Sequence, residues 1–298
     1  VISPMSFVHL HFHSQYSLLD GLCNIKDMVA EAKALGMPAL ALTDHGTMFG
    51  AIEFYRACKK QGINPILGVE TYVAARKMTD RDPQLDSKQF HLLLLAENQT
   101  GWQNLLKIAS ASQLEGFYYK PRIDHDFLAA HADGLIATTG CMHGEVPRAL
   151  NEDNPAAAQR LLDYYYGVFG PERFFIELQD HDIPELRRVN RQLLELGPRY
   201  AASYVATNDV HYVRSEDYTL HDILLCIQTA SLVSATDRMR MTDNSYFLRS
   251  PDEMRRLFGE VPGAIENTLA IAERCQVNLD VKGYHLPRFP VPEGFTAE

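Results

Sequence analysis

The residues that decide the fold read VHLHFH over positions 8–13 and ALALTDHG over positions 39–46. The second stretch is a continuous apolar run that ends in polar residues, which is typical of a strand buried on both faces of a sheet. The first alternates histidine with apolar residues and indicates another strand. Both predicted strands end in residues of metal-binding type, so we expect a functional site at one edge of the sheet.

The same succession of a short apolar run, a loop and an amphipathic helix continues along the chain and is typical of βα units in a parallel sheet. Strands are predicted over residues 7–11, 39–42, 65–69, 91–95, 135–139, 174–178 and 203–206. Helices are predicted over residues 25–35 (N-cap Asn24), 48–61 (stopped by Gly62), 102–112, 156–168 and 183–196. Seven such units favour an α/β fold with a closed or nearly closed (β/α) barrel.

Beyond His211 the pattern becomes helical, and it ends in a proline-rich stretch. Helices are predicted over residues 217–229, 251–258 and 262–275, and an extended linker over residues 287–292. We expect one domain over residues 6–284, with the barrel over 6–215 and a helical extension over 216–284. Residues 1–5 are expected to be a disordered leader ahead of a natural start at Met5, and residues 285–298 a linker towards further domains.

Composition excludes several classes of protein. The 298 residues carry 28 Lys and Arg against 38 Asp and Glu, a net charge of −10, and this acidic balance argues against a broad nucleic-acid-binding face. No apolar run approaches the roughly 20 residues of a membrane span, and the start does not resemble a secretory signal. The cysteines are scattered and odd in number, which favours a reducing cytoplasm: Cys23, Cys58, Cys141, Cys226 and Cys275.

Metal-ligand residue types stand at the carboxyl ends of the predicted strands. Residues two apart on a strand point to the same face, so His11 and His13 are placed to hold one ion, and Asp209 and His211 repeat this spacing. Each pair alone is more often a solvated strand face. Two pairs on the first and last strands, which are neighbours in a closed barrel, favour a metal site. The remaining candidates at strand ends are Asp44, His45, Glu70 and Cys141.

Several residues have a plainer interpretation. Glu70 suits a bridge between two cations but also a loop carboxylate, and Cys141 alone is more often a small core residue. His91 opens its apolar run instead of closing it, and Asp20 precedes a glycine and indicates a turn. Asp44 is a candidate for orienting a ligand histidine. Nothing supports a ligand role for the remaining histidines, which are His9, His125, His131, His143, His181, His221 and His285.

These residues lie in a set of blocks that resembles a known family. Residues 8–21 and 42–46, continued by 62–70, 116–124, 206–212 and 286–290, resemble the polymerase-and-histidinol-phosphatase (PHP) domain. The similarity is closer to the version that opens the alpha subunit of bacterial replicative DNA polymerase III. It covers nearly the whole chain. The resemblance implies a distorted, seven-stranded, TIM-like (β/α) barrel with a trinuclear metal centre.

Carried over position by position, the resemblance implies three ligand sets. The first set is His11, His13, Glu70 and Asp209; the second is Glu70, His91 and Cys141; the third is Asp20, His45 and His211. Each position keeps a residue able to bind metal, which favours an active site over a relic. The cysteine favours zinc, with manganese and iron as alternatives.

The resemblance also implies an activity. A metal-bound water, with Asp20, His45, His211 and bridging Glu70 around it, would hydrolyse a DNA phosphodiester at a primer 3′ end as a 3′→5′ proofreading exonuclease. Independently of the resemblance, Lys120 and Arg122 are candidate phosphate contacts, and ordinary surface charges on a loop are an equal alternative. Two alternatives stay open: a small-molecule phosphatase of the same superfamily, and a metal-binding scaffold for the polymerase and a separate proofreading subunit. The expected partners are the primer, further polymerase domains of the same chain and that subunit.

Overall fold

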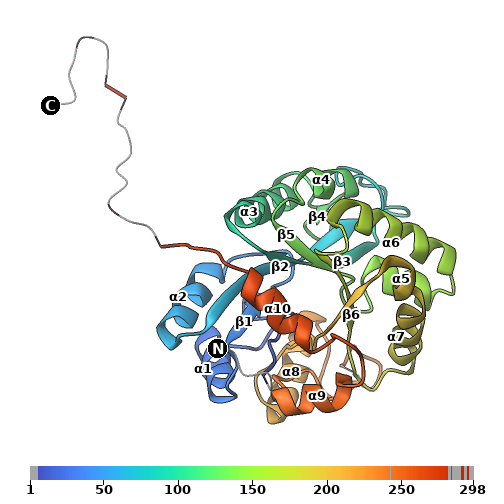
Figure 1. Ribbon diagram of the computed structural model, residues 1–298. Coiled ribbons are helices and arrows are strands. Elements are labelled where there is room, and N and C mark those ends of the chain that lie inside the picture. The colour runs from blue at the N-terminus through green and yellow to red at the C-terminus, as the bar shows by residue number, and fades with distance from the viewer. Residues whose placement is uncertain (1–5, 242, 281–282, 284–289, 292–293, 295–298) are drawn as a thin grey trace.

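The computed structural model describes residues 6–241, 243–280, 283, 290–291 and 294, and shows a curled sheet surrounded by helices (Figure 1). The strands are β1 (Ala39–Leu42), β2 (Asn64–Ala74), β3 (Gln89–Ala96), β4 (Arg122–Ile123), β5 (Leu135–Thr138), β6 (Phe174–Leu178) and β7 (Ser203–Ala206). The helices are α1 (Ile25–Ala34), α2 (Ala51–Gln61), α3 (Gln99–Leu114), α4 (His125–Ala130), α5 (Glu145–Asn151), α6 (Pro155–Phe169), α7 (Pro184–Leu196), α8 (Tyr218–Gln228), α9 (Pro251–Phe258) and α10 (Glu266–Arg274).

The sheet is mixed, which corrects the prediction of a purely parallel βα arrangement. Its strand order is β1-β2-β3-β5-β6-β7, with β4 beside β2. β3 runs antiparallel to both β2 and β5, while the other pairs are parallel. The reason is the connection between β2 and β3, which contains no crossover helix, so the chain turns back directly alongside β2.

The predicted first strand, residues 7–11, is not a regular strand. Its backbone nevertheless joins the two ends of the sheet: Ala41 N donates to His9 O at 3.0 Å, and Val210 N donates to His11 O at 3.2 Å. The described strands therefore form a curled sheet whose end strands, β1 and β7, are bridged by an irregular segment. The mixed α/β fold with a curled sheet agrees with the predicted class, whereas a full seven-stranded TIM-like barrel is not seen among the described strands.

Alternate strand residues supply two cores. Leu40 and Leu42 of β1 belong to the larger cluster shared with the surrounding helices, whereas Ala39 and Ala41 belong to a smaller cluster enclosed by the sheet. Ile271 of α10 joins this enclosed cluster, and α10 crosses the middle of the view in Figure 1. The C-terminal helix of the predicted extension thus closes one end of the curled sheet.

Several predicted elements are confirmed with their bounds. These are the strands over residues 39–42, 174–178 and 203–206 and the helix over 251–258. The Asn24 side chain caps α1, and Gly62 ends α2 with a φ of 70°. The sequence analysis missed the short elements β4, α4 and α5.

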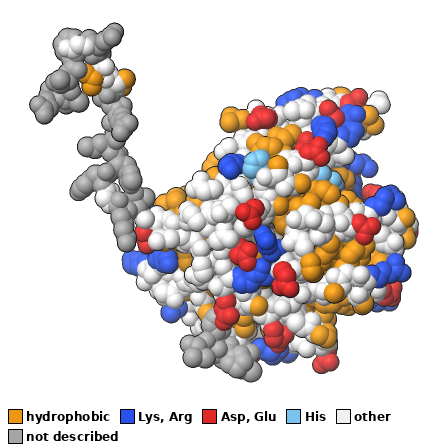
Figure 2. Space-filling view, turned by 45° about the horizontal axis from the view of Figure 1, so that its top comes forward, with side chains coloured by type: hydrophobic (Ala, Val, Ile, Leu, Met, Phe, Trp, Pro, Cys, Tyr) orange, Lys and Arg blue, Asp and Glu red, His pale blue; other side chains and the backbone are white. Residues whose placement is uncertain are grey.

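The leader over residues 1–5 lies outside the described residues, as does most of the linker over 285–298. Within the described part of the chain, every helix is too short or too polar to cross a membrane. On the face shown in Figure 2, acidic and basic side chains are interspersed, and hydrophobic side chains gather in patches between them.

Candidate metal centre

Four histidines surround the carboxylate of Glu70, which is 1% exposed near the carboxyl end of the enclosed face of β2. Its Oε2 lies 2.6 Å from His45 Nδ1 and 3.5 Å from His13 Nε2. Its Oε1 lies 3.0 Å from His91 Nδ1 and 3.3 Å from His11 Nε2. Each carboxylate oxygen therefore faces two imidazoles, which is the arrangement expected of a group shared between cations.

Asp209 stands on the other side of the same two histidines. Its Oδ1 lies 3.1 Å from His11 Nε2 and 3.2 Å from His13 Nε2. The Asp209 backbone has a φ of 46°, in the left-handed region that aspartate tolerates better than most residues. Its carbonyl lies 2.7 Å from His211 Nδ1. Because a carbonyl only accepts, Nδ1 carries the proton and Nε2 of His211 keeps its lone pair.

A third group forms around Asp20. Asp20 Oδ2 lies 2.8 Å from His45 Nε2 and 3.8 Å from His211 Nε2. The His13 ring lies between them, with its centroid 4.1 Å from that of His45 and 4.4 Å from that of His211. His221 of α8, which the sequence analysis left unassigned, donates from Nε2 to the Asp20 carbonyl at 2.7 Å and holds this loop in place.

His91 and Cys141 complete the set from β3 and the loop after β5. Cys141 Sγ lies 3.5 Å from His91 Nδ1 and 3.7 Å from Glu70 Oε1. The position of His91 follows from the direction of β3. Because this strand is antiparallel, its first residues lie beside the carboxyl ends of the others. The structure thus brings all nine predicted ligand residues into one cluster.

The buried carboxylate of Glu177 holds the His11 ring in orientation. Glu177 Oε1 on β6 accepts from His11 Nδ1 at 2.7 Å, so Nε2 of His11 faces Glu70 and Asp209. Sequence reasoning missed Glu177, although a glutamate in the apolar run FFIEL over residues 174–178 was a usable signal.

The position of Asp44 beside His45 suggested that it orients a ligand histidine. In the structure the histidine that it supports is His13, and not its neighbour His45. Its Oδ1 accepts from the Ser17 hydroxyl at 3.0 Å, and Ser17 Oγ in turn lies 3.0 Å from His13 Nδ1. Asp44 also accepts from the backbone N–H of Ser14 at 2.6 Å. Its carboxylate therefore supports His13 through Ser17.

The electrostatics of the cluster are those of closely packed opposite charges. Although burial opposes it, His91, His11 and His45 hold the pKa of Glu70 well below its usual range. Burial, together with the His45 and His211 rings, lowers the pKa of His13 to about 3. Burial and the carboxylates of Glu70 and Asp209 raise the pKa of the Cys141 thiol well above its usual value. Metal binding by this thiol would therefore release a proton.

The donor set fits divalent cations. Several of its buried polar atoms lie close to oppositely charged groups and yet have no hydrogen-bond partner: His11 Nε2, His13 Nε2, His45 Nδ1, Glu70 Oε2 and Asp209 Oδ1. Unpaired buried polar atoms are costly, whereas a shared cation satisfies all of them at once. Four overlapping trios drawn from His11, His13, His45, Glu70, His91, Cys141, His143 and His211 each place their ligand atoms within 4.8 Å of one another.

A cavity of about 520 Å³ opens over this cluster. Six predicted ligands line it, namely Asp20, His45, His91, Cys141, Asp209 and His211. Other parts of its lining are apolar, including Ile183, Leu186 and Met239. Lys120 also lines the cavity, with its Nζ 5.5 Å from the centroid of the Tyr72 ring.

Arg122 does not contact the cavity, which corrects its assignment as a candidate phosphate ligand. The residue is 0% exposed, and its guanidinium donates to the carbonyls of Gly116, Met78, Asp80 and Asp86. These bonds tie the loop between β2 and β3 to the segment before β4. Arg122 is therefore a structural residue.

Among the described histidines without a predicted role, some lie beside the cluster and the others lie elsewhere. His143, His181 and His221 lie at or beside the cluster, and His181 Nδ1 lies 2.6 Å from Ser245 Oγ. His9 is buried elsewhere and contacts the Arg249 carbonyl at 2.9 Å. His125 and His131 lie on and directly after α4, and His285 is outside the described residues.

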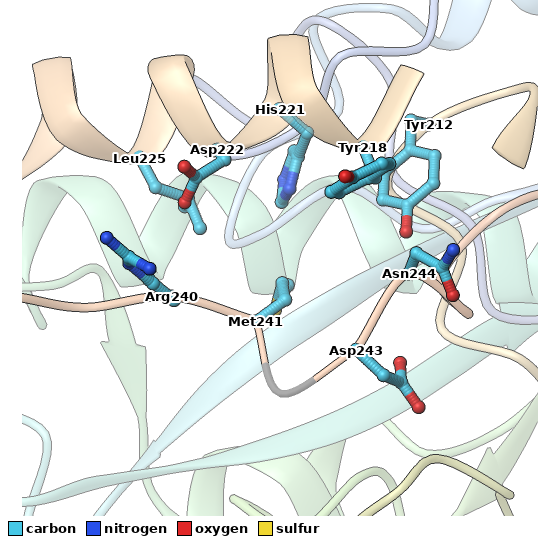
Figure 3. A pocket seen from close by; sticks show the side chains of 9 residues that line it. All are labelled: Tyr212, Tyr218, His221, Asp222, Leu225, Arg240, Met241, Asp243 and Asn244. Atoms are coloured by element: carbon cyan, nitrogen blue, oxygen red, sulfur yellow. The ribbon is translucent and has the colours of Figure 1, made fainter. Parts of the chain in front are cut away.

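A second cavity, of about 480 Å³, lies between α8 and the segment around Arg240 and Asp243 (Figure 3). His221, Asp222 and Leu225 of α8 face this segment across the cavity in Figure 3. Among the residues that line it, none is a predicted metal ligand. His221 nevertheless connects the two regions, because it also bonds to Asp20.

Comparison with known proteins shows what the chain is similar to. A family model of the PHP domain matches residues 9–181. DNA polymerase III subunit alpha of Thermus aquaticus is 44% identical over 304 residues, covering 99% of this chain and 25% of that protein. The corresponding subunit of Treponema pallidum is 42% identical over 298 residues, covering 100% of this chain and 26% of that protein.

The chain therefore spans about a quarter of the length of these curated relatives. Among solved structures, an amidohydrolase from Chromobacterium violaceum with bound sulfate and no metal is 17% identical, with a TM-score of 0.44. That match covers 69% of this chain and 88% of the other.

Proposed function

Because this chain belongs to the PHP domain family, we propose that it is the metal-dependent phosphoesterase domain of a DNA polymerase III alpha subunit. Its proposed reaction is hydrolysis of the terminal phosphodiester at a mismatched primer 3′ end, a 3′→5′ proofreading exonuclease activity. The proposed partners are the primer, the remaining polymerase domains of the same chain and a separate proofreading subunit. The proposed location is the cytoplasm.

The observation that carries this proposal is the convergence of nine ligand-type side chains below one cavity, with Glu70 at their centre. We propose three divalent cations, each held by one ligand set: His11, His13, Glu70 and Asp209; Glu70, His91 and Cys141; and Asp20, His45 and His211. The Cys141 thiolate favours zinc over manganese or iron. Bound cations of this kind lower the pKa of a coordinated water and neutralise phosphate oxygens.

The chain's own residues would then bind and orient the substrate. Lys120, on the cavity wall beside Tyr72, is placed to pair with a phosphate oxygen by charge. The apolar wall around Leu186 suits the sugar and base of a terminal nucleotide, and it keeps bulk water from the phosphate. Asp20, His45, His211 and Glu70 would hold the attacking water near the phosphorus through the cations.

The acidic composition of the chain limits how it binds DNA. With a net charge of −10 and the mixed face seen in Figure 2, the cations and Lys120 supply the local positive charge for one phosphate. Extended contacts to the primer backbone would come from the rest of the polymerase. The activity of this domain alone is therefore best tested first on a short diester.

The test compares a diester with a monoester. We expect the zinc-loaded chain to hydrolyse the p-nitrophenyl ester of thymidine 5′-monophosphate faster than p-nitrophenyl phosphate, and to shorten a primer–template with a 3′ mismatch. Faster hydrolysis of the monoester would instead indicate a small-molecule phosphatase. Asp20→Asn should abolish diester hydrolysis while the metal-free protein stays folded, because Asp20 lies at the cavity and not in the core.

A scaffold role gives the opposite result with the same variants. If metals serve only stability, the zinc-loaded wild type would show no metal-dependent hydrolysis, and Asp20→Asn and His45→Gln would only lower its melting temperature. A matched control is Asp27→Asn, a carboxylate in the first turn of α1 and away from the cluster. This control should retain both activity and metal content.

A further inference from the structure

His143 lies beside His91 and Cys141, although its spacing in the sequence suggested no ligand role. Cys141 Sγ is 3.9 Å from His143 Nδ1, and the His91 and His143 ring centroids are 5.2 Å apart. His91, Cys141 and His143 offer ligand atoms that all lie within 4.8 Å of one another. The three residues thus form a corner of the cluster with a donor outside the nine predicted ligands.

The backbone holds this corner in place independently of any side-chain contact. His91 N donates to His143 O at 3.0 Å, and Gly144 N donates to Cys141 O at 2.9 Å. The turn begins at Gly140 with a φ of 71°, where a Cβ would lie 3.3 Å from the His91 carbonyl. Only glycine adopts this conformation readily, so the close approach of the turn to β3 depends on it.

The distances suit a tetrahedral site. Zinc bonds of about 2.0–2.1 Å to nitrogen or oxygen and about 2.3 Å to sulfur place neighbouring ligand atoms about 3.3–3.7 Å apart in a tetrahedron. Cys141 Sγ lies 3.5 Å from His91 Nδ1, 3.7 Å from Glu70 Oε1 and 3.9 Å from the Nδ1 of His143. Each distance from the sulfur therefore lies at or within about 0.2 Å of a tetrahedral edge, and the ligand atoms of His91, Cys141 and His143 lie within 4.8 Å of one another.

Resting on the proposed metal binding, we propose that His143 is a fourth protein ligand that closes the site formed by Glu70, His91 and Cys141. Four protein donors fill a tetrahedral zinc site, which is the pattern of structural zinc, whereas catalytic zinc keeps an open position. This corner then anchors the turn after β5 to β3. By the same count, the set of three donors formed by Asp20, His45 and His211 keeps an open position for the attacking water.

Cobalt(II) in place of zinc tests this assignment by its absorption spectrum. The thiolate-to-cobalt charge-transfer band reports on Cys141 alone among the proposed ligands, and the intensity of the visible d–d bands reports on tetrahedral coordination. We expect wild type to show both, with Cys141→Ser losing the charge-transfer band. His143→Ala should keep that band, lower the part of the d–d intensity that the ion at this corner contributes and weaken cobalt binding at this corner about 10-fold or more.

A substituted ligand and a control complete the test. His143→Cys should restore the tetrahedral d–d intensity and raise the charge-transfer absorbance about twofold, because two thiolates then bind one ion. His131→Ala, which removes a histidine after α4, should leave the spectrum unchanged. Identical spectra for wild type and His143→Ala would overturn the assignment of His143 as a fourth ligand. The proposed hydrolysis of a diester would not be affected by that result. If wild type shows no thiolate band at all, metal binding at this corner fails together with the assignment.

Discussion

Glu177→Gln tests how far the metal centre depends on a buried residue that contacts only one of its ligands. Glu177 Oε1 accepts from His11 Nδ1 at 2.7 Å, from Thr207 Oγ1 at 2.5 Å and from Gln179 Nε2 at 3.0 Å. Glutamine keeps the shape of the side chain and an oxygen acceptor, but it removes the negative charge. The substitution therefore weakens the bond to His11, and it also replaces Oε2, which accepts from the Thr138 hydroxyl, by an NH2 group that cannot accept.

The expected effect on zinc binding follows from the bond to His11, because His11 is the metal ligand among the partners of Glu177. A hydrogen bond to a charged group contributes about 1.5–3 kcal/mol and a neutral one about 0.5–1.5 kcal/mol, so the charge is worth about 1–1.5 kcal/mol. This corresponds to zinc binding that is roughly 10-fold weaker at the ion held by His11, within the range observed when partners of metal ligands are replaced. The other two ligand sets do not include His11 and should keep their affinity.

The assay is competition between the protein and a chromogenic zinc chelator at pH 7. Glu172→Gln is the matched control, because Glu172 is exposed just before β6. Far-ultraviolet circular dichroism checks that both variants are folded before titration. Zinc affinity of Glu177→Gln equal to that of Glu172→Gln would refute the claim that Glu177 supports the metal centre through His11.

Three further outcomes follow from the described contacts. Arg122→Lys should lower the free energy of unfolding by about 3 kcal/mol or more in urea, without loss of zinc, because lysine leaves several buried carbonyls unpaired. Lys120→Ala should slow diester hydrolysis several-fold in steady-state assays, with unchanged zinc content. Although burial opposes it, Glu70 and Asp20 raise the pKa of His45 from 6.5 to about 10. His45 thus stabilises metal-free protein fully below pH 6.5, and melting temperatures should fall as pH rises towards 10, less steeply in His45→Gln.

Sequence periodicity was sufficient for most of the fold because the strands enclose apolar residues on both faces. The run over residues 39–42 and the strand Phe174–Leu178 have the predicted bounds for this reason. The direction of β3 was not predicted, since a strand has the same pattern whichever way it runs. The polar connection without a helix between residues 76 and 89 was the available signal for an antiparallel neighbour.

Some residues of the candidate site could be predicted from their spacing in the sequence, and others could not. His11 and His13 were found by their spacing, whereas His91 and Asp20 were promoted only by the resemblance to a family. His143 is brought to the cluster by a turn that wraps around the start of β3, and such a tertiary contact leaves no spacing in the sequence. Arg122 was predicted as a candidate phosphate contact because it is a charged residue in a loop-like segment, but the structure shows that it is fully buried.

The central claim is that the side chains around Glu70 share divalent cations. Anomalous diffraction from crystals grown with zinc, recorded on both sides of the zinc absorption edge, tests it directly. We expect strong anomalous peaks within bonding distance of His11, His91 and His211, all inside the cluster that surrounds Glu70. Crystals of folded, zinc-saturated protein with peaks only at surface residues, and none between these histidines, would contradict it.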